Sequence, residues 1–293
     1  MNPTIELHKE PGMTKQRFDD QHTPSYGSYV EGELIAHETS EWQDIKIVQT
    51  ETHGKVMLID DVLMLSEDTH HVYHEHMVHL PLACIEIPKS VLVIGGGDGG
   101  TVNELVKYDG LERIVLAELD EAVVRVSQET LPDLTSGLKD PRVEIRIGDG
   151  AAYLAEQTDA FDAIIIDSTD VCEESAGVQE NANPLIEPPF YEAIKKAIRP
   201  GGVTCQMLGS PTFYPTGMEM MYHRLADLFT HFKPFLMPTP FYISGDWGGG
   251  IFSDDNDLTP RFAHVSPEKL IYFNADIAKG ALALPNSVRK MMK

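Results

Sequence analysis

The feature that most constrains the fold is a repeat, starting after Pro88, of an apolar segment, a short polar loop and an amphipathic segment. The amphipathic segments have helical periodicity, and the apolar ones are short enough to be strands. Strands that are apolar on both faces and separated by helices form a parallel sheet covered on two sides. We therefore predict an α/β fold with a Rossmann-like, doubly wound sheet. The apolar segments are VLVIGGG, IVLAELD, VEIRIGDG, AIIIDSTD and VTCQML.

A different pattern precedes this repeat. Residues 1–30 are polar and rich in Pro, Gly and His, which predicts a weakly structured lead-in. Short alternating runs then predict a small antiparallel β-domain, followed by a linking helix. We expect the N-terminal β-domain and linking helix to span 31–80 and the Rossmann-like catalytic domain to span 81–293.

The charge of the chain narrows its partners. It carries 46 acidic and 23 basic residues, a formal net charge of -23. Such a field repels nucleic acid and anionic membranes and attracts cations, although acidity also serves solubility alone. No apolar run approaches the roughly 20 residues that cross a bilayer. With three scattered cysteines and no leader-like start, we expect a cytoplasmic protein that binds neither nucleic acid nor membrane.

Acidic residues follow four successive predicted strands. Because ligands bind beyond the carboxyl ends of strands in an open parallel sheet, these side chains are expected to share one site. A surface charge at one strand end is common, whereas a set at four ends indicates function. The acids are Asp98, Glu118 with Asp120, Asp149, and Asp167 with Asp170.

The first two strand ends predict the contacts to the sugar and the charged part of a nucleoside ligand. The loop with Gly95, Gly97 and Gly100 has dinucleotide spacing, but Asp98 inside it would face a pyrophosphate. The loop therefore favours a positively charged ligand without phosphate, such as a sulfonium nucleoside. Glu118 lies 18 positions after Gly100, which suits an acid that binds ribose hydroxyls.

The other two strand ends predict the adenine contact and the chemistry. Asp149 beside the Gly150 amide can read an adenine amino edge, unless it only ends a strand in a turn. Asp167 and Asp170 follow the fourth strand and suit a cationic amine. An alkylammonium has a pKa near 10, so a carboxylate must hold the cation and accept its proton before nitrogen can attack carbon. Asp167 is the predicted base.

The segments IGGGDGG, ELDE, GDG and DSTD, in this order, resemble the spermidine synthases, the polyamine aminopropyltransferases. SEWQDIKIV, VYHEHMVHLPL, PTPFYISGDWG and YFNADIAKGALALP extend the resemblance from about residue 32 to the C-terminus. It implies a small N-terminal β-domain, a methyltransferase-like Rossmann domain and a homodimer or homotetramer. We expect no prosthetic group, and also no metal, because no cysteine or acid completes a recognised ligand set with His70 and His74. The co-substrate would be decarboxylated S-adenosylmethionine, held by Gln43, His74, Asp98, Glu118, Asp149 and Gly150. A di- or polyamine acceptor, such as putrescine, would contact Tyr73, Asp167, Asp170 and Tyr242.

The chain departs from the family pattern on the acceptor side. The family's DSSDPxGPAxxLF segment is here DSTDVCEESAGVQENANPLIEPPF, Met64 replaces a glutamine, and Gly209 replaces a frequent glutamate. The donor is therefore better supported than the acceptor. Two alternatives stay open: an S-adenosylmethionine-dependent amine N-methyltransferase and a catalytically silent homologue. Asp98 argues against the first, because it would repel the carboxylate of intact S-adenosylmethionine.

Overall fold

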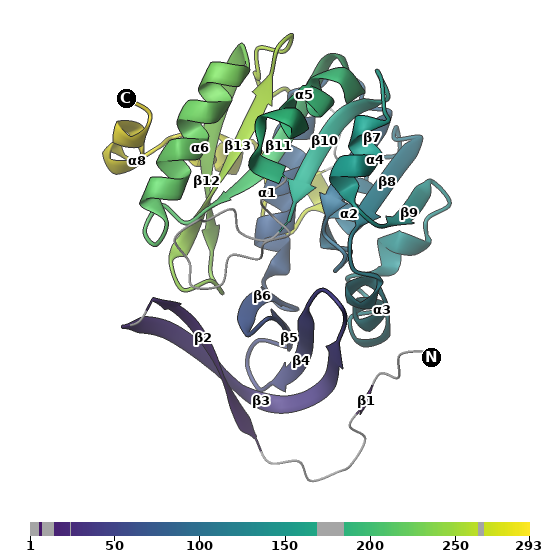
Figure 1. Cartoon of the computed structure of the whole chain (residues 1–293), viewed down its shortest axis with the longest axis vertical. Helices are drawn as coiled ribbons and strands as arrows, with labels where there is room; N and C mark the ends of the chain where they lie inside the picture. The colour runs from purple at the N-terminus through teal and green to yellow at the C-terminus, as the bar shows by residue number, and fades with distance from the viewer. Residues whose placement is uncertain (1–5, 8–14, 24, 169–184, 263–266) are drawn as a thin grey trace.

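The computed structural model describes residues 6–7, 15–23, 25–168, 185–262 and 267–293. It contains two sheets, a smaller N-terminal one and a larger one flanked by helices, with the two stacked along the long axis of the molecule (Figure 1). Within the described residues, no helix has the length and apolar character needed to span a membrane.

The N-terminal sheet is antiparallel, as predicted. Its strand order is β1-β3-β4-β5-β6, and β2 pairs with the N-terminal half of β3. The turn between β5 and β6 places Asp60 and Asp61 at φ 51° and 63°, the left-handed conformation that a tight two-residue hairpin requires. The strands are β1 (Glu6–Leu7), β2 (Gln16–Thr23), β3 (Tyr26–Thr39), β4 (Asp44–Thr50), β5 (Lys55–Ile59) and β6 (Val62–Ser66).

The N-terminal lead-in corrects one expectation. Residues 1–30 were expected to be weakly structured, yet β2 and the first part of β3 lie within them and pair in an antiparallel ladder. The segment QRFDDQHT has no apolar alternation, so its strand depends on backbone pairing with β3 and not on a pattern of its own.

The larger sheet has the order β12-β13-β11-β10-β7-β8-β9. The strands from β11 to β9 are parallel, and β13 is antiparallel to both β11 and β12. The predicted Rossmann-like sheet is confirmed, and chain order reverses between β7 and β10, where such sheets bind ligands. The strands are β7 (Ser90–Gly95), β8 (Arg113–Glu118), β9 (Val143–Ile147), β10 (Phe161–Asp167), β11 (Ile198–Gly209), β12 (His231–Thr239) and β13 (Gly245–Ser253).

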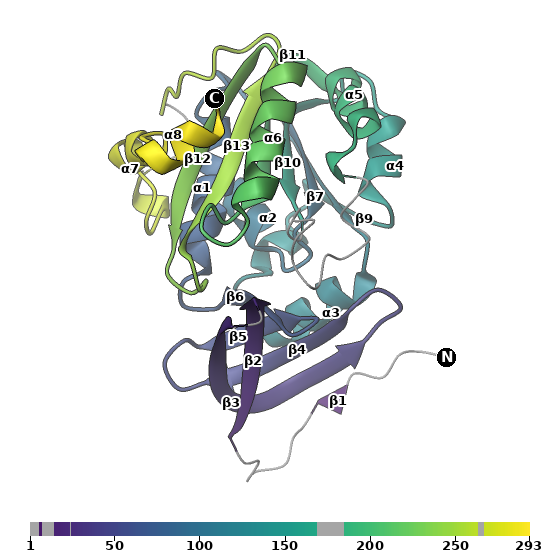
Figure 2. The same cartoon turned by 60° about the vertical axis from the view of Figure 1, so that its left-hand side comes forward.

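Helices cover both faces of this sheet (Figure 2). Val91 and Val93 of β7 pack in a core with α1, α2 and α7, whereas Leu92 and Ile94 pack in a second core with α4, α5, α6 and α8. The helices are α1 (His70–Leu82), α2 (Gly100–Leu105), α3 (Glu121–Thr130), α4 (Gly150–Ala155), α5 (Pro188–Ala197), α6 (Pro215–Leu228), α7 (Ala275–Ala281) and α8 (Asn286–Met291), with short 3-10 turns at Ser136–Lys139 and Pro267–Lys269.

Two helices connect the sheets. The sequence pattern groups α1 with the N-terminal strands, but in the structure it packs on α2, β10, β11 and β12. Helix α3 lies beside the N-terminal sheet, where Val123 and Val126 share a core with Ile45 and Ile47. Arg125 of α3 donates to both carboxylate oxygens of Glu38 on β3, at 2.8 and 2.5 Å. These contacts therefore fix the position of the N-terminal sheet relative to α3 and the larger sheet.

Candidate active site

A cavity of about 400 Å³ lies between the two sheets, at the carboxyl ends of the parallel strands. Cavities of this size hold small organic ligands. Every predicted site residue that the structure describes lines it: Gln43, Tyr73, His74, Asp98, Glu118, Asp149, Gly150, Asp167 and Tyr242. Asp170 lies outside the described residues.

Glu118 is the last residue of β8, and Asp149 follows the neighbouring strand β9. Both residues line the cavity. Glu118 accepts the amides of Gly97 and Asp120 at 3.0 and 2.9 Å. Burial raises the pKa of Glu118 to about 7, although these two amides partly offset the effect. Asp149 Oδ1 accepts the amides of Ala151 and Ala152 and so caps α4. Asp149 is thus both a helix cap and a residue of the cavity wall.

Two side chains that line the cavity, Glu118 and His74, pack directly against the glycine loop. A Cβ added at Gly97 would lie 2.8 Å from Cγ of Glu118. A Cβ at Gly100 would lie 2.2 to 2.5 Å from three ring atoms of His74. Both positions therefore exclude a side chain, so that an acid and an imidazole can lie against the loop.

His74 of α1 faces Asp98 of the loop. Its Nε2 lies 3.4 Å from Asp98 Oδ1, which also accepts the Gly100 amide at 2.8 Å. Burial alone would lower the pKa of His74, but Asp98 and Asp167 outweigh it and raise that pKa. On the other side, Nδ1 of His74 lies 3.1 Å from Nδ1 of His70. Burial and the charge of His74 lower the pKa of His70 to about 3, so this second ring is neutral.

Asp167 is held by two hydroxyls. Tyr73 donates to Oδ1 at 2.7 Å, and Thr101 donates to Oδ2 at 2.5 Å. Burial raises the pKa of Asp167, His74 opposes that effect and Asp98 adds to it. The acid at the end of β10 is therefore basic for a carboxylate and fixed in orientation.

The side of the cavity that Tyr242 lines is aromatic and apolar. Tyr242 donates its hydroxyl to the Met64 carbonyl at 2.6 Å and packs edge-on against Trp247, with ring centroids 5.0 Å apart. Asp20 of β2 also lines the cavity and is only 2% exposed. The sequence did not single out Asp20, because it lies in the segment expected to lack structure.

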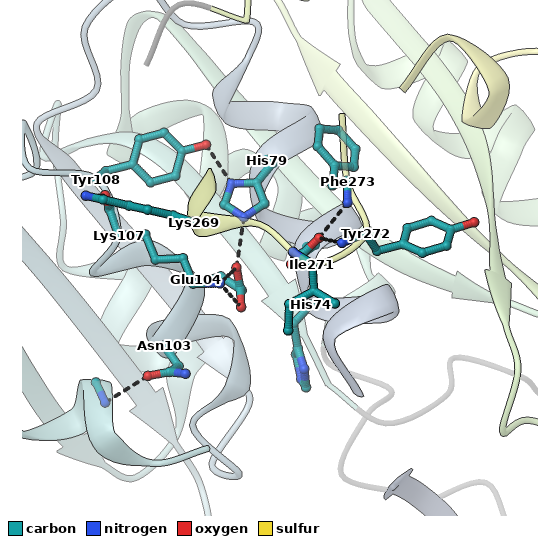
Figure 3. Close-up of polar contacts among 12 residues, drawn as sticks. His74, His79, Asn103, Glu104, Lys107, Tyr108, Lys269, Ile271, Tyr272 and Phe273 are labelled. Atoms are coloured by element: carbon teal, nitrogen blue, oxygen red, sulfur yellow. Dashed lines mark hydrogen bonds and ion pairs between the residues drawn. The ribbon is translucent and has the colours of Figure 1, made fainter. Parts of the chain in front are cut away.

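Polar contacts anchor the opposite side of α1 (Figure 3). The buried Glu75 carboxylate accepts the amides of Ile271, Tyr272 and Phe273 at 2.7, 2.8 and 2.6 Å. One turn further on, His79 lies between the Tyr108 hydroxyl and the Glu104 carboxylate, at 2.8 and 2.9 Å. These contacts fix the helix that presents Tyr73 and His74.

Ser40 connects the N-terminal sheet to the acid of β8. Its Oγ donates to Asp120 Oδ2 at 2.6 Å and accepts the amides of Trp42 and Gln43 at 2.9 and 3.0 Å. Asp120 in turn donates its amide to Glu118 and accepts the Ala122 amide at the start of α3. One network thus positions Gln43 and Glu118 relative to each other, which no local sequence pattern indicates.

Among the described residues, His74, Asp98 and Asp167 bring potential metal-ligand atoms within 4.8 Å of one another. Their polar atoms are engaged with one another, with the Gly100 amide and with the hydroxyls of Tyr73 and Thr101. The arrangement offers carboxylates to cationic ligands.

Comparison with known proteins agrees with this geometry. Residues 70–260 match the model of the spermine/spermidine synthase domain, and residues 29–67 match that of the spermidine synthase tetramerisation domain. A polyamine aminopropyltransferase of Thermoanaerobacter sp. is 35% identical over 88% of this chain and 91% of its own length. A crystal structure of spermidine synthase in complex with the transition-state analogue AdoDATO superposes with a TM-score of 0.87 and 29% identity, over 97% of this chain and 98% of that one.

The fold and the cavity define a Rossmann-like transferase with an N-terminal β-sheet. The chain belongs to the spermine/spermidine synthase family, as the sequence resemblance indicated. The family also includes a relative with another name: putrescine N-methyltransferase 2 of Nicotiana attenuata is 34% identical over 89% of this chain and 72% of its own. Family membership therefore leaves the transferred group to be argued from the site.

Proposed function

We propose that this protein transfers the aminopropyl group of decarboxylated S-adenosylmethionine to a di- or polyamine and releases methylthioadenosine. The observation that carries the proposal is the position of Asp98 and Asp167, which line one cavity and flank the same imidazole of His74. Two carboxylates so close together suit two cationic ligands that must meet. The curated relatives named polyamine aminopropyltransferase support the same reading.

The donor would lie along the glycine loop. Glu118 would accept the ribose hydroxyls, Asp149 and the Gly150 amide would contact adenine, and Gln43 would close the site from the N-terminal sheet. Asp98 and His74 would hold the free amino end of the donor. Asp98 and Asp167 raise the pKa of His74 and so favour its protonated form in this acidic pocket. A cationic donor would take over that role.

The acceptor would lie between Asp167 and the aromatic wall. Tyr73 and Tyr242 would border its methylene chain, and Asp167 would hold the reacting nitrogen. Asp170 is assigned to the acceptor by the resemblance alone. Asp20 of β2 adds a further carboxylate to the cavity wall.

The reaction balances without an external acid or oxidant. Asp167 accepts one proton from the acceptor ammonium, and the freed lone pair forms a bond to the donor's aminopropyl carbon. The carbon–sulfur bond breaks at the same time, and its electron pair neutralises the sulfonium. The leaving group is a neutral thioether, so it needs no proton. Most of the rate acceleration would come from in-line positioning and from carboxylates that hold the cations.

Methyl transfer from intact S-adenosylmethionine is the second candidate, favoured by the Nicotiana attenuata relative. Asp98 argues against it here, because the amino end of that donor also carries a carboxylate, which Asp98 would repel. A silent homologue would have no need for the tightly held Asp167.

We also propose that the protein is a homo-oligomer, because its N-terminal sheet matches the tetramerisation domain of the family. A homotetramer fits that description better than a homodimer, and closed symmetric oligomers are common. The cytoplasmic location stays a prediction. The predicted boundaries at 30/31 and 80/81 fall inside β3 and α1.

Product identification tests the proposal. The protein is incubated with an amine mixture and either donor, and the products are identified by mass. Methylthioadenosine with an amine heavier by one aminopropyl group supports the proposal. S-adenosylhomocysteine with a methylated amine would replace it by the second candidate, and no product with either donor would indicate a silent homologue. Separate turnover with putrescine, cadaverine, agmatine and spermidine then ranks the acceptors.

A further inference from the structure

The two oxygens of Asp167 are bonded by hydroxyls from two different helices. Tyr73 of α1 lines the cavity, but Thr101 of α2 is fully buried and lies behind the carboxylate. The 2.5 Å contact of Thr101 with Oδ2 is the shorter of the two. Together these bonds fix the rotation of the carboxylate, whereas either alone would leave it free to turn.

The surrounding backbone makes room for this contact. Gly96 has φ 72°, and a Cβ there would lie 2.9 Å from Asp167 Oδ2. In helices, threonine hydroxyls commonly bond to a carbonyl of the preceding turn. Thr101 lies in the first turn of α2 and donates instead to a side chain 66 positions further along the chain. The bond is therefore a feature of the tertiary structure.

We propose that Thr101 is a positioning residue for the reaction: it keeps Asp167 ionised and turns the carboxylate toward the acceptor nitrogen. This inference rests on the proposed function of Asp167 as the base. Each carboxylate oxygen can accept two hydrogen bonds, and each accepts one from the part of the chain that the structure describes. The remaining lone pairs are available to a bound ammonium.

The electrostatics around Asp167 make this bond matter. Burial favours the neutral acid and so raises its pKa, whereas a hydroxyl that donates to the carboxylate favours the ionised form. Removing the Thr101 hydroxyl would therefore raise the pKa of Asp167 further. Among the described residues, the titratable or charged groups that face Asp167 are Tyr73 and His74 of α1, Asp98 of the glycine loop and Cys205 of β11.

Thr101→Val tests the inference, because valine keeps the shape and removes the hydroxyl. The turnover number is measured against pH with both substrates saturating. A hydrogen bond to a charged group corresponds to a shift of about one pH unit. We expect the acid limb, where Asp167 becomes protonated, to move up by about one unit in Thr101→Val. The limb returns to its wild-type position in Thr101→Ser. The KM of the donor should change less than about twofold, which corresponds to about 0.4 kcal/mol, because Thr101 contacts Asp167 and not the residues assigned to the donor.

Thr204→Val is the matched control, since Thr204 is also buried and lies in the neighbouring strand beside Ile164. It should leave the pH profile unchanged. The inference is overturned if Thr101→Val lowers turnover equally at all pH values, or if Thr204→Val shifts the limb by the same amount.

A second readout does not depend on turnover. The carboxylate band of Asp167, identified by its loss in Asp167→Asn, is titrated by difference infrared spectroscopy in the wild type and in Thr101→Val. A higher midpoint in Thr101→Val supports the role of Thr101 even if the protein proves inactive with both donors, which would refute the proposed function alone. Equal midpoints in an active protein refute the role of Thr101 alone.

Discussion

Replacing Ser40 by alanine should weaken donor binding while the fold persists. The hydroxyl is the only polar group of the serine side chain; it donates to Asp120, accepts the amides of Trp42 and Gln43, and lies 3.3 Å from the Gln43 carbonyl. Removing it releases the loop that carries Gln43 from the network that fixes Glu118. Arg125 and Glu38 still join the two sheets, as does the apolar core beneath α3.

The size of the effect follows from the geometry. A hydrogen bond to a charged acceptor contributes about 1.5 to 3 kcal/mol. Solvent that reaches the loop between β3 and β4 replaces part of this, so we expect about 1.4 kcal/mol to appear as lost donor affinity, which is a tenfold higher Kd. The acceptor KM should change little, because Ser40 is remote from Tyr73 and Tyr242 in the network of contacts described above.

Calorimetric titration with the donor measures the effect directly. Thr39→Val is the matched control: the Thr39 hydroxyl donates to Asp44 at 2.6 Å on the same hairpin, outside the network. Ser40→Thr should restore affinity, since it restores the hydroxyl. If Ser40→Ala binds the donor as the wild type does and only its melting temperature falls, then Ser40 stabilises the fold and the reasoning about Gln43 is wrong.

Three further predictions concern the donor side. Donor affinity should fall as pH drops from 8 to 6, because Glu118, with a pKa of about 7, is ionised above that value and protonated below it. Glu118→Gln should bind the donor about tenfold more weakly and show no such pH dependence. If the variant keeps the same pH dependence, another group causes it. Gly100→Ala should cost at least tenfold in donor affinity, since its Cβ would lie 2.2 Å from the His74 ring; calorimetry showing wild-type affinity would contradict this. Asp98→Asn should raise the affinity for S-adenosylmethionine relative to its decarboxylated form by about tenfold, and an unaltered ratio of the two Kd values would rule out the discrimination assigned to Asp98.

The sequence predicted the large sheet because its strands are apolar on both faces. The acids at the strand ends follow from the same reading, since parallel strands bring their carboxyl ends to one edge. The N-terminal strand β2 could not be predicted in this way. Its residues are mostly polar, and it forms because the backbone of β3 offers unpaired amides and carbonyls.

The parts of the site that the sequence did not reveal are those that act through hydrogen bonds between distant elements. Thr101 and Ser40 are ordinary residues in their local segments, and only the fold shows which carboxylate or amide each one contacts. Asp149 shows a second limit of sequence-based prediction, because the same residue both caps α4 and lines the cavity. A strand-end acid can serve both roles, which the spacing alone does not separate.

The central claim is that carboxylates hold two cations together and that Asp167 takes the proton from the attacking amine. Single-turnover measurement of aminopropyl transfer by Asp167→Asn, with both substrates bound, tests it most directly. General-base contributions are typically 10²- to 10⁴-fold, so we predict a rate lower by about 10³ with donor affinity within about threefold of the wild type. Transfer by Asp167→Asn at the wild-type rate would contradict the account.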